Sequence, residues 1–481
     1  MMRINALHRC IWHLSTACLL LVAAGCPQTP QPAPEPKASE RARPLVLLVA
    51  DDPELGKAIA REWQGRTEQE LTVREVSFAE IAAASRLPAD VVIFPTGWLG
   101  QLAERDLIVP LDPATLEQPE FEQRDIFEHV RLREMRWAGK TLATPLGSPQ
   151  FLLCYRADLF AKLDLKPPTT WTEYQQIAER LADRANLGAF APEEGKPWQG
   201  AIEPLAEGWA GQWLLARAAA YALHREQVSP LFRFDSLQPL IAEPSYVRAL
   251  EELVAAAKVG RQREKRSTGQ EAFAALCRGE CAMAIGWPTG QADLAESAAT
   301  NVAFAPLPGA REAFRTATKS WETRGEEESP SIPFLGVSGR MAAVTSSSAD
   351  ARRATGFVIW LAGREVSAQL APHSSAITLF RNSQVAASGR WTPALSADGS
   401  RQYAETLAGV LAAPRALPPM NVPGRQEYLT ALDEAVYQAL AGQPAKVALS
   451  TAARQWQATT EKLGAEKQRR AIHRSLGLEK L

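Results

Sequence analysis

The sequence predicts an α/β fold in which mostly parallel sheets are flanked by helices, and its length predicts two lobes. Apolar runs alternate with helical patterns early in the chain, an order typical of parallel sheets. A chain of 481 residues is too long for one compact core. Hydrophobic residues make up 46% of it and charged residues 22%, as in ordinary globular proteins. The net charge of −1 argues against a nucleic-acid partner.

The first predicted strand lies in PLVLLVAD, residues 44–51, a continuous apolar run typical of a buried parallel strand. A helix is predicted next, because Leu55, Ile59 and Trp63 recur at four-residue spacing and form one apolar face. The segments LTVREVSF and DVVIFPTGW predict two further strands, and LGQLAERDLIVPLD predicts a helix with a short return.

Later helices are indicated by their start signals and their apolar periodicity. Thr170 with Glu173, and Thr268 with Glu271, have the spacing of capping boxes. Helical patterns recur at Ala351 to Leu361 and from Gln426 to Leu440, and the C-terminal part is expected to be helical throughout. Residues 309–333, which include SWETRGEEESPS, interrupt this rhythm and are interpreted as an exposed, charged loop.

The N-terminus has the features of an export signal. Arg3 and Arg9 precede a short apolar stretch that ends in AAGC, so residues 1–25 are expected to be removed. AAGC resembles a bacterial lipoprotein box, although Ala23 stands where that motif usually has leucine, and the resemblance implies lipidation of Cys26. The alternative is an ordinary signal peptide followed by a coincidental cysteine. Residues 26–43 are rich in proline and are expected to form an extended tether.

These features predict an extracytoplasmic lipoprotein, held at a membrane in the periplasm or at the cell surface. No later apolar run approaches the length of a membrane span. In an oxidising compartment a close cysteine pair favours a disulfide, so we expect Cys277 and Cys281 to be bonded across the turn at Gly279. A zinc site would need two more ligands, and none is evident in the sequence.

The sequence lacks the common catalytic and cofactor motifs. It has no Walker A sequence, no G-x-G-x-x-G after a strand, no H-E-x-x-H and no G-x-S-x-G. The histidines expected in the mature chain, His129, His224, His373 and His473, are isolated from one another. We therefore expect no catalytic residue, no metal and no cofactor.

Tryptophans are the strongest candidates for ligand contact. Trp98, Trp209 and Trp287 lie at predicted turns rather than in helix stripes. Ligands of open α/β sheets bind beyond the carboxyl ends of the strands, where a flat ring can stack on an apolar ligand face. For each ring the alternative is packing in the core.

Six segments, taken in order, resemble the extracellular solute-binding proteins of ABC importers, the maltose-binding-like family 1. They are ADVVIFPTGWLGQLAERDLIVPLD, GKTLATPLGSPQFLLCYRADLFAKLDLKPPTTWTEY, AFAALCRGECAMAIGWPTG, VAFAPLPG, FLGVSGRMAAV and VPGRQEYLTALDEAVYQALAG. The resemblance implies a two-lobed periplasmic-binding-protein-like fold with ligand between the lobes. It places lobe one at residues 44–145 and 336–381, and lobe two at residues 146–335 and 382–481.

The resemblance also implies which residues line the cleft. The implied residues are Pro95, Thr96, Gly97 and Trp98 after the third strand, Ser148, Pro149 and Gln150 at the crossover, and Trp209, Trp287, Thr289, Gly336 and Ser338. Asp51 and Asp52 replace an aromatic-rich turn of the family and are expected as polar contacts. The crossover lacks the acidic residue that is frequent there.

The implied function is capture of a small solute, a sugar or oligosaccharide, by a monomer that closes over it and delivers it to an ABC-type permease. Two alternatives are an exported hydrolase or lyase that uses the same cleft, and a ligand-sensing lipoprotein without a transporter. An enzyme would need a carboxylate pair or a nucleophile facing the tryptophans.

Overall fold

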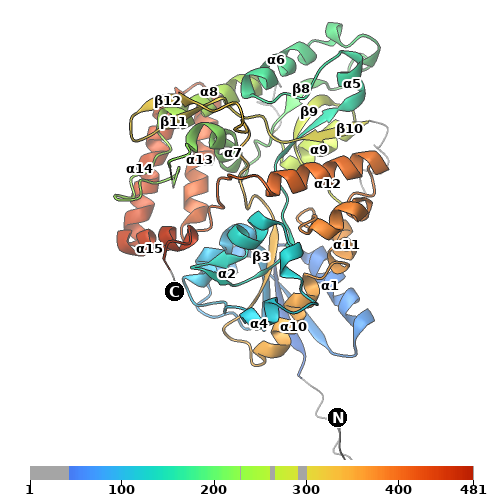
Figure 1. Cartoon of the computed structure of the whole chain (residues 1–481), viewed down its shortest axis with the longest axis vertical. Helices are drawn as coiled ribbons and strands as arrows, with labels where there is room; N and C mark the ends of the chain where they lie inside the picture. The colour runs from blue at the N-terminus through green and yellow to red at the C-terminus, as the bar shows by residue number, and fades with distance from the viewer. Residues whose placement is uncertain (1–42, 228, 260–265, 291–300, 480–481) are drawn as a thin grey trace, which may run out of the picture. The chain divides into compact units, whose positions relative to one another are not determined.

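The computed structural model describes residues 43–227, 229–259, 266–290 and 301–479. Residues 44–481 form one compact unit, which Figure 1 shows as two sheets with their covering helices. The predicted signal peptide, the tether up to residue 42 and the lipidation site Cys26 lie outside the described residues.

The first sheet has five strands in the order β2-β1-β3-β13-β6. Strand β1 pairs in parallel with β2 and β3, whereas β13 is antiparallel to both β3 and β6. The bounds are β1 (Leu45–Ala50), β2 (Leu71–Val76), β3 (Val91–Pro95), β6 (Thr144–Gly147) and β13 (Arg340–Val344). The strands predicted in residues 44–51, LTVREVSF and DVVIFPTGW are confirmed.

The second sheet has four strands in the order β10-β7-β9-β8. Only β8 and β9 pair in parallel, while β7 is antiparallel to both β9 and β10. The bounds are β7 (Leu152–Arg156), β8 (Gln199–Ile202), β9 (Cys281–Gly286) and β10 (Val302–Ala305). Strand β9 is buried along its whole length, as expected of an inner strand.

The predicted α/β class is confirmed, and one strand in each sheet runs against the others, β13 in the first sheet and β7 in the second. Strand β13 enters the first sheet at Arg340, whose strand partners Pro95 and Gly147 are the last residues of β3 and β6. Strand β7 likewise begins at Leu152, opposite Gly286 at the end of β9. A strand that enters a sheet at the edge where its neighbours leave it must run antiparallel to them.

Helices pack against both sheets (Figure 1). Helices α1 (Pro53–Arg66) and α10 (Ala351–Leu361) contact the first sheet, and α6 (Trp171–Ala182), α9 (Gly269–Cys277) and α12 (Ala397–Leu411) contact the second. Both predicted capping boxes are present, at Thr170 with Glu173 and at Thr268 with Glu271. Helix α13 (Arg425–Leu440) packs on α7 (Ala210–Ala222) and α14 (Ala445–Leu463).

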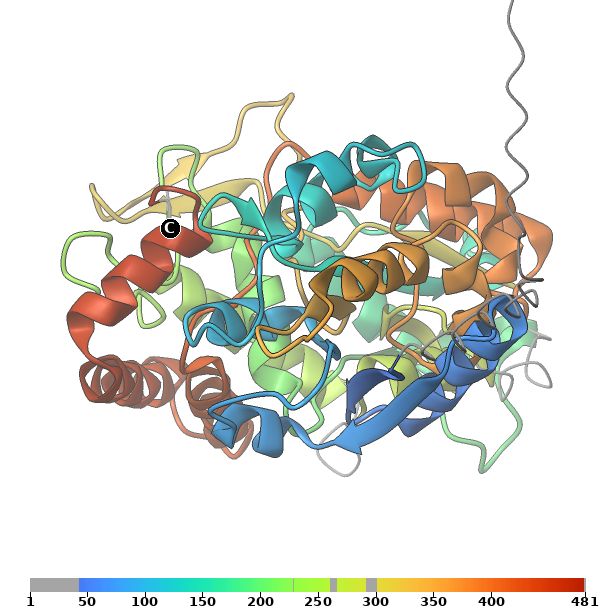
Figure 2. The ribbon, with the colours of Figure 1, turned by 90° about the horizontal axis from the view of Figure 1, so that it is seen from below.

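The remaining helices and a small hairpin complete the fold. Helix α15 (Ala465–Ser475) contacts α14 at the C-terminal end of the fold (Figure 2). Helix α8 (Pro244–Val259) contacts α7. The shorter elements are α2 (Phe78–Ala83), α3 (Leu99–Ala103), α4 (Pro113–Leu116), α5 (Ala157–Lys162), α11 (Val366–Leu370), β4 (Arg136–Trp137) and β5 (Lys140–Thr141). Among the described helices, none is long and apolar enough to cross a membrane.

Residues 309–333 are not the exposed loop that the sequence predicts. They contain an antiparallel hairpin of β11 (Glu312–Arg315) and β12 (Ser320–Thr323), in which Phe314 lies opposite Trp321. The ring centroids of these two residues are 5.4 Å apart, and Phe314 is buried. The segment thus contains two short strands, EAFR and SWET, of which β11 packs against α7.

The predicted disulfide between Cys277 and Cys281 is absent, and both residues are thiols, as is Cys154. Phe304 lies opposite Cys154, and Cys154 opposite Ala284, so these three side chains share one face of the sheet. That face is covered by α9 and α12, through ring contacts of Phe304 with Phe273 and Tyr403. Cys281 is three residues from Ala284 and points to the opposite face, away from α9 and Cys277.

We predict that both thiols are protected by burial rather than by a bond. Burial raises the pKa of Cys277 to about 12 and that of Cys281 further, so little nucleophilic thiolate forms in the folded protein. Alkylation of the unreduced protein should therefore be slow in buffer and complete in denaturant. Trypsin cleaves after Arg278, so the two cysteines should appear as separate alkylated peptides, and a disulfide-linked pair of peptides would contradict the structure.

Candidate functional site

The carboxyl ends of β3 and β6 in the first sheet and of β9 in the second lie beside the chain segments that connect the two sheets. Arg340 begins β13 between Pro95 and Gly147, so the turn after β3 and the crossover after β6 flank the same residue. The backbone N–H of Thr96 donates to the carbonyl of Gly339 at 3.1 Å. We call this region, where the two lobes meet, the lobe boundary.

Asp52 contacts side chains of the lobe boundary, whereas Asp51 accepts a hydrogen bond from the backbone of the first lobe. The Asp52 carboxylate accepts a hydrogen bond from the Ser374 hydroxyl at 2.6 Å and lies 3.5 Å from Nε of Arg340. Asp51 has a left-handed backbone, with φ of 44°, and its carboxylate accepts from the N–H of Phe78 at 2.9 Å. Of the two predicted contacts, Asp52 is the one that forms an ion pair with Arg340 within 4.0 Å in the described part of the chain.

Trp98 belongs to a small stack on the first-lobe side. Its ring centroid is 5.6 Å from that of Phe78, and the Arg340 guanidinium lies 5.9 Å from the Phe78 ring centroid. Trp98 is half-buried, whereas Thr96 and Gly97 before it are buried. The short 3₁₀ turn Thr96–Trp98 thus places the Trp98 ring, the Thr96 hydroxyl and the backbone of Gly97, which carries no side chain of its own, close together.

Glu134 is a fully buried carboxyl group in the crossover region. It lies at the end of a π-helical turn, Val130–Glu134, and its Oε1 accepts from the N–H of Gly336 at 3.0 Å. Burial raises the pKa of Glu134 to about 7, although the Ser148 hydroxyl and the Gly336 N–H act in the opposite direction. Close to neutral pH this carboxyl can therefore both accept and donate hydrogen bonds.

Ser148, Gln150 and Gly336 surround Glu134. The side-chain amide of Gln150 donates to the Ser148 hydroxyl at 3.3 Å, and the Ser148 N–H donates to the Thr378 hydroxyl at 3.0 Å. Gly336 has φ of 71°, and a Cβ there would lie 2.6 Å from Pro419. Only glycine combines this conformation with this close approach.

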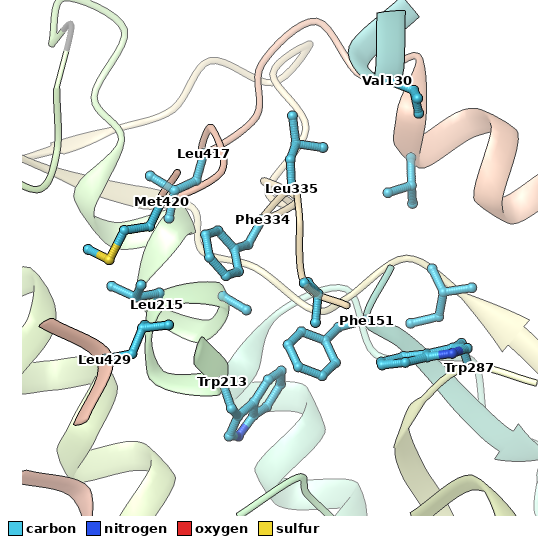
Figure 3. Packing of buried hydrophobic residues seen from close by; sticks show 14 of the residues in the cluster. Val130, Phe151, Trp213, Leu215, Trp287, Phe334, Leu335, Leu417, Met420 and Leu429 are labelled. Carbon is cyan, nitrogen blue, oxygen red and sulfur yellow. The ribbon is translucent and has the colours of Figure 1, made fainter. Parts of the chain in front are cut away.

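Trp287 lies in an aromatic cluster from the second lobe (Figure 3). Its ring centroid is 5.6 Å from Trp209 and 5.9 Å from Phe151, and Phe151 in turn is 5.5 Å from Trp213. Trp287 is fully buried, and its indole N–H donates to the Ser375 carbonyl at 3.0 Å. Trp209 is only half-buried and is the ring of the cluster with surface left for a ligand.

Arg425 crosses to the first lobe from the N-terminus of α13. A methyl group on Gly97 would overlap its guanidinium, at 2.7 Å from Cζ, so the cation lies directly against the turn after β3. One guanidinium N–H donates to Gln212 Oε1 at 3.0 Å. Gln212 is oriented by donating its amide N–H to the Gly208 carbonyl at 2.9 Å.

Five polar atoms at this boundary are buried and make no hydrogen bond to the described residues. They are Thr96 Oγ1, Glu134 Oε2, Gln150 Oε1, Arg340 Nε and Arg425 Nε. A buried polar atom without a partner costs roughly 1–3 kcal/mol, and native proteins keep few of them. At the lobe boundary, donors and acceptors of a bound molecule can complete the hydrogen bonds of these five atoms.

Most predicted site residues thus lie in this region. The residues that meet around Arg340 and Glu134 are Asp52, Thr96, Gly97, Trp98, Ser148, Gln150 and Gly336. Trp287 donates to the carbonyl of Ser375, and Trp209 packs on Trp287. Pro95, Pro149, Thr289 and Ser338 lie in the same segments, the first and last half-buried and the other two buried. Whether each contacts a solute stays a prediction.

Sequence reasoning missed Glu134, Arg340, Gln212 and Arg425. Two signals were available: Arg340 is a charged residue at the start of the apolar strand RMAAV, and Gln212 interrupts an apolar helix, AGQWLLARAAAYA. Glu134 and Arg425 stand among other charged residues, where nothing in the sequence separates a buried side chain from a solvated one.

Known proteins share this architecture. A family model described as bacterial extracellular solute-binding protein matches residues 57–368, which confirms the resemblance seen in the sequence. Among solved structures, an ABC transporter solute-binding protein from Agrobacterium radiobacter K84, in complex with ribitol, is 19% identical with a TM-score of 0.65. The match covers 87% of this chain and 98% of that one. A second, from Agrobacterium vitis S4 with bound D-mannitol, is 19% identical with a TM-score of 0.62, covering 87% and 99%.

We predict that Glu134 makes stability depend on pH. The raised pKa means that the folded state disfavours the ionised carboxyl, so stability falls as pH rises from 4.5, its ordinary pKa, to about 7. A shift of this size corresponds to about 3 kcal/mol in the free energy of unfolding. Glu134→Gln removes the titration and can still accept from Gly336.

Urea denaturation of both proteins at pH 5 and pH 8 measures this effect. The free energy of unfolding of Glu134→Gln relative to the unsubstituted protein should be higher at pH 8 than at pH 5 by up to about 3 kcal/mol. An equal difference at both values would mean that Glu134 is ionised in the folded state throughout this range.

Proposed function

Because the chain belongs to the bacterial extracellular solute-binding proteins, we propose that it captures a sugar or sugar alcohol between its two lobes. Hydroxyl groups of such a solute both donate and accept hydrogen bonds, which matches the mixed set of unpartnered atoms at the boundary. The half-buried ring of Trp209 is suited to pack on the C–H face of a sugar.

The observation that carries this proposal is that five buried polar atoms without a hydrogen bond to the described residues lie at the lobe boundary. Thr96 and Arg340 belong to the first sheet and its turns, whereas Arg425 and the aromatic cluster belong to the second lobe. A solute that contacts both groups favours the closed arrangement, because only there are all of its hydrogen bonds made. The ribitol and D-mannitol of the two structural relatives are of the same chemical class.

Delivery and anchoring complete the proposal. We infer that lipidation of Cys26 and the proline-rich tether keep the protein at the membrane, which raises its effective concentration at an ABC-type permease. We infer that the lobes join at crossovers near residues 146, 336 and 382, and that the protein binds and releases its solute without a chemical step.

Isothermal titration of the full chain with ribitol, D-mannitol and a panel of mono- and oligosaccharides tests this function. We expect at least one of them to bind, with a change in tryptophan fluorescence because the aromatic cluster lies at the site. The protein should bind without converting the solute, which chromatography of the recovered ligand would show.

Trp209 supplies a sharper test. Trp209→Ala should weaken binding roughly tenfold, the loss expected when about 1.4 kcal/mol of stacking is removed. Trp360→Ala is the matched control, since Trp360 is also half-buried but packs on Trp63 of α1, at 4.9 Å between ring centroids. An equal loss in both variants, or no binding by the unsubstituted protein to any member of the panel, would contradict the proposal.

A further inference from the structure

Residues of both lobes fix the position of the Arg425 side chain at the lobe boundary. Gly97 of the first lobe leaves room for its guanidinium, and Gln212 of the second lobe accepts one of its N–H groups at 3.0 Å. Because Gln212 is itself tied to the Gly208 carbonyl, its oxygen points at the guanidinium. The position of the cation is therefore built by two neighbours rather than left to a free side chain.

The charge of Arg425 is not balanced within the described part of the chain. No carboxylate oxygen of the described residues forms an ion pair with it within 4.0 Å, and its buried Nε makes no hydrogen bond. Burial lowers the pKa of Arg425 to about 10, which still leaves it charged at neutral pH. By contrast, the buried Arg156 donates to both oxygens of the Asp158 carboxylate.

The carboxylates of the boundary are already engaged elsewhere. Asp52 accepts from Ser374 and lies beside Arg340, and Asp51 accepts from the backbone of Phe78. Glu134 is held by Gly336 and has a raised pKa. The turn Thr96–Trp98 therefore has Arg340 with its acidic neighbour on one side and an unbalanced cation, Arg425, on the other.

We propose that the captured solute carries a negatively charged group, a carboxylate or a phosphate, which is bound by Arg425 beside the turn Thr96–Trp98. This inference rests on the proposed function and narrows it to acidic sugar derivatives. An anion supplies what the guanidinium lacks, because a charge-assisted hydrogen bond to Nε–H offsets the desolvation of the cation. The hydroxyl of Thr96, which makes no hydrogen bond to the described residues, belongs to the same turn and can donate to the anion as well.

The test compares neutral and acidic solutes of the same carbon skeleton on the full chain by isothermal titration. The neutral probes are D-mannitol and D-glucose, the carboxylates are D-mannonate, D-gluconate and D-glucuronate, and the phosphates are mannitol 1-phosphate and glucose 6-phosphate. We expect an acidic member to bind at least about tenfold more tightly than its neutral counterpart, with weaker binding at high salt. Comparing the carboxylate probes with the phosphate probes shows which of the two anionic groups the site binds.

Arg425→Gln should abolish the preference for the acidic solute, and Arg425→Lys should retain part of it, since lysine keeps the charge but not the fork of donors. Arg415→Gln is the matched control. Arg415 is also half-buried in the second lobe, but it is paired with Glu328 at 3.2 Å. Thermal melts show whether each variant remains folded.

The outcomes separate this inference from the function on which it rests. Loss of the acidic preference in Arg425→Gln alone supports it. Neutral polyols binding as tightly as their acids, or an acidic preference unchanged in Arg425→Gln, would overturn it and leave solute capture standing. No binding of any neutral or acidic sugar would overturn both.

Discussion

The site depends on one constraint, the antiparallel entry of β13 into the first sheet. Arg340 begins that strand with Pro95 on one side and Gly147 on the other. The ends of β3 and β6 and the start of β13 therefore lie at the same edge of the sheet. This register brings the turn after β3 and the crossover after β6 together around one guanidinium. Glu134 is held near the same edge because its carboxylate accepts a hydrogen bond from the backbone N–H of Gly336, which lies four residues before Arg340.

The lobe boundary combines tight backbone packing with unsatisfied side chains. Glycines at 97, 147 and 339 leave no room for a Cβ, and backbone atoms or side chains of the neighbouring segments fill that space. Polar atoms of Thr96, Glu134 and Gln150 are nevertheless buried without partners. Such atoms lower the stability of the protein without ligand, and in a binding site a bound molecule offsets this cost by forming the missing hydrogen bonds.

The secondary structure was largely predictable, because local signals carry it. The capping boxes at Thr170 and Thr268 start helices as predicted, and the buried run after Pro44 is a strand. Errors arose where tertiary contacts decide. The hairpin within residues 309–333 packs its strand β11 against α7, and the faces to which Cys277 and Cys281 point follow from the pairing of β7 with β9 and β10.

By itself the sequence determined the α/β class, most helices and strands, the family and the tryptophan-bearing turns, because periodicity, capping and ordered motifs are local properties of the chain. Only the tertiary structure decided the mixed strand directions and the partners of Asp52 and Trp287. It also decided that Glu134, Arg340 and Arg425 are functional candidates. Burial and charge balance depend on residues hundreds of positions apart, as with Gly97 and Arg425, and no local pattern records that contact.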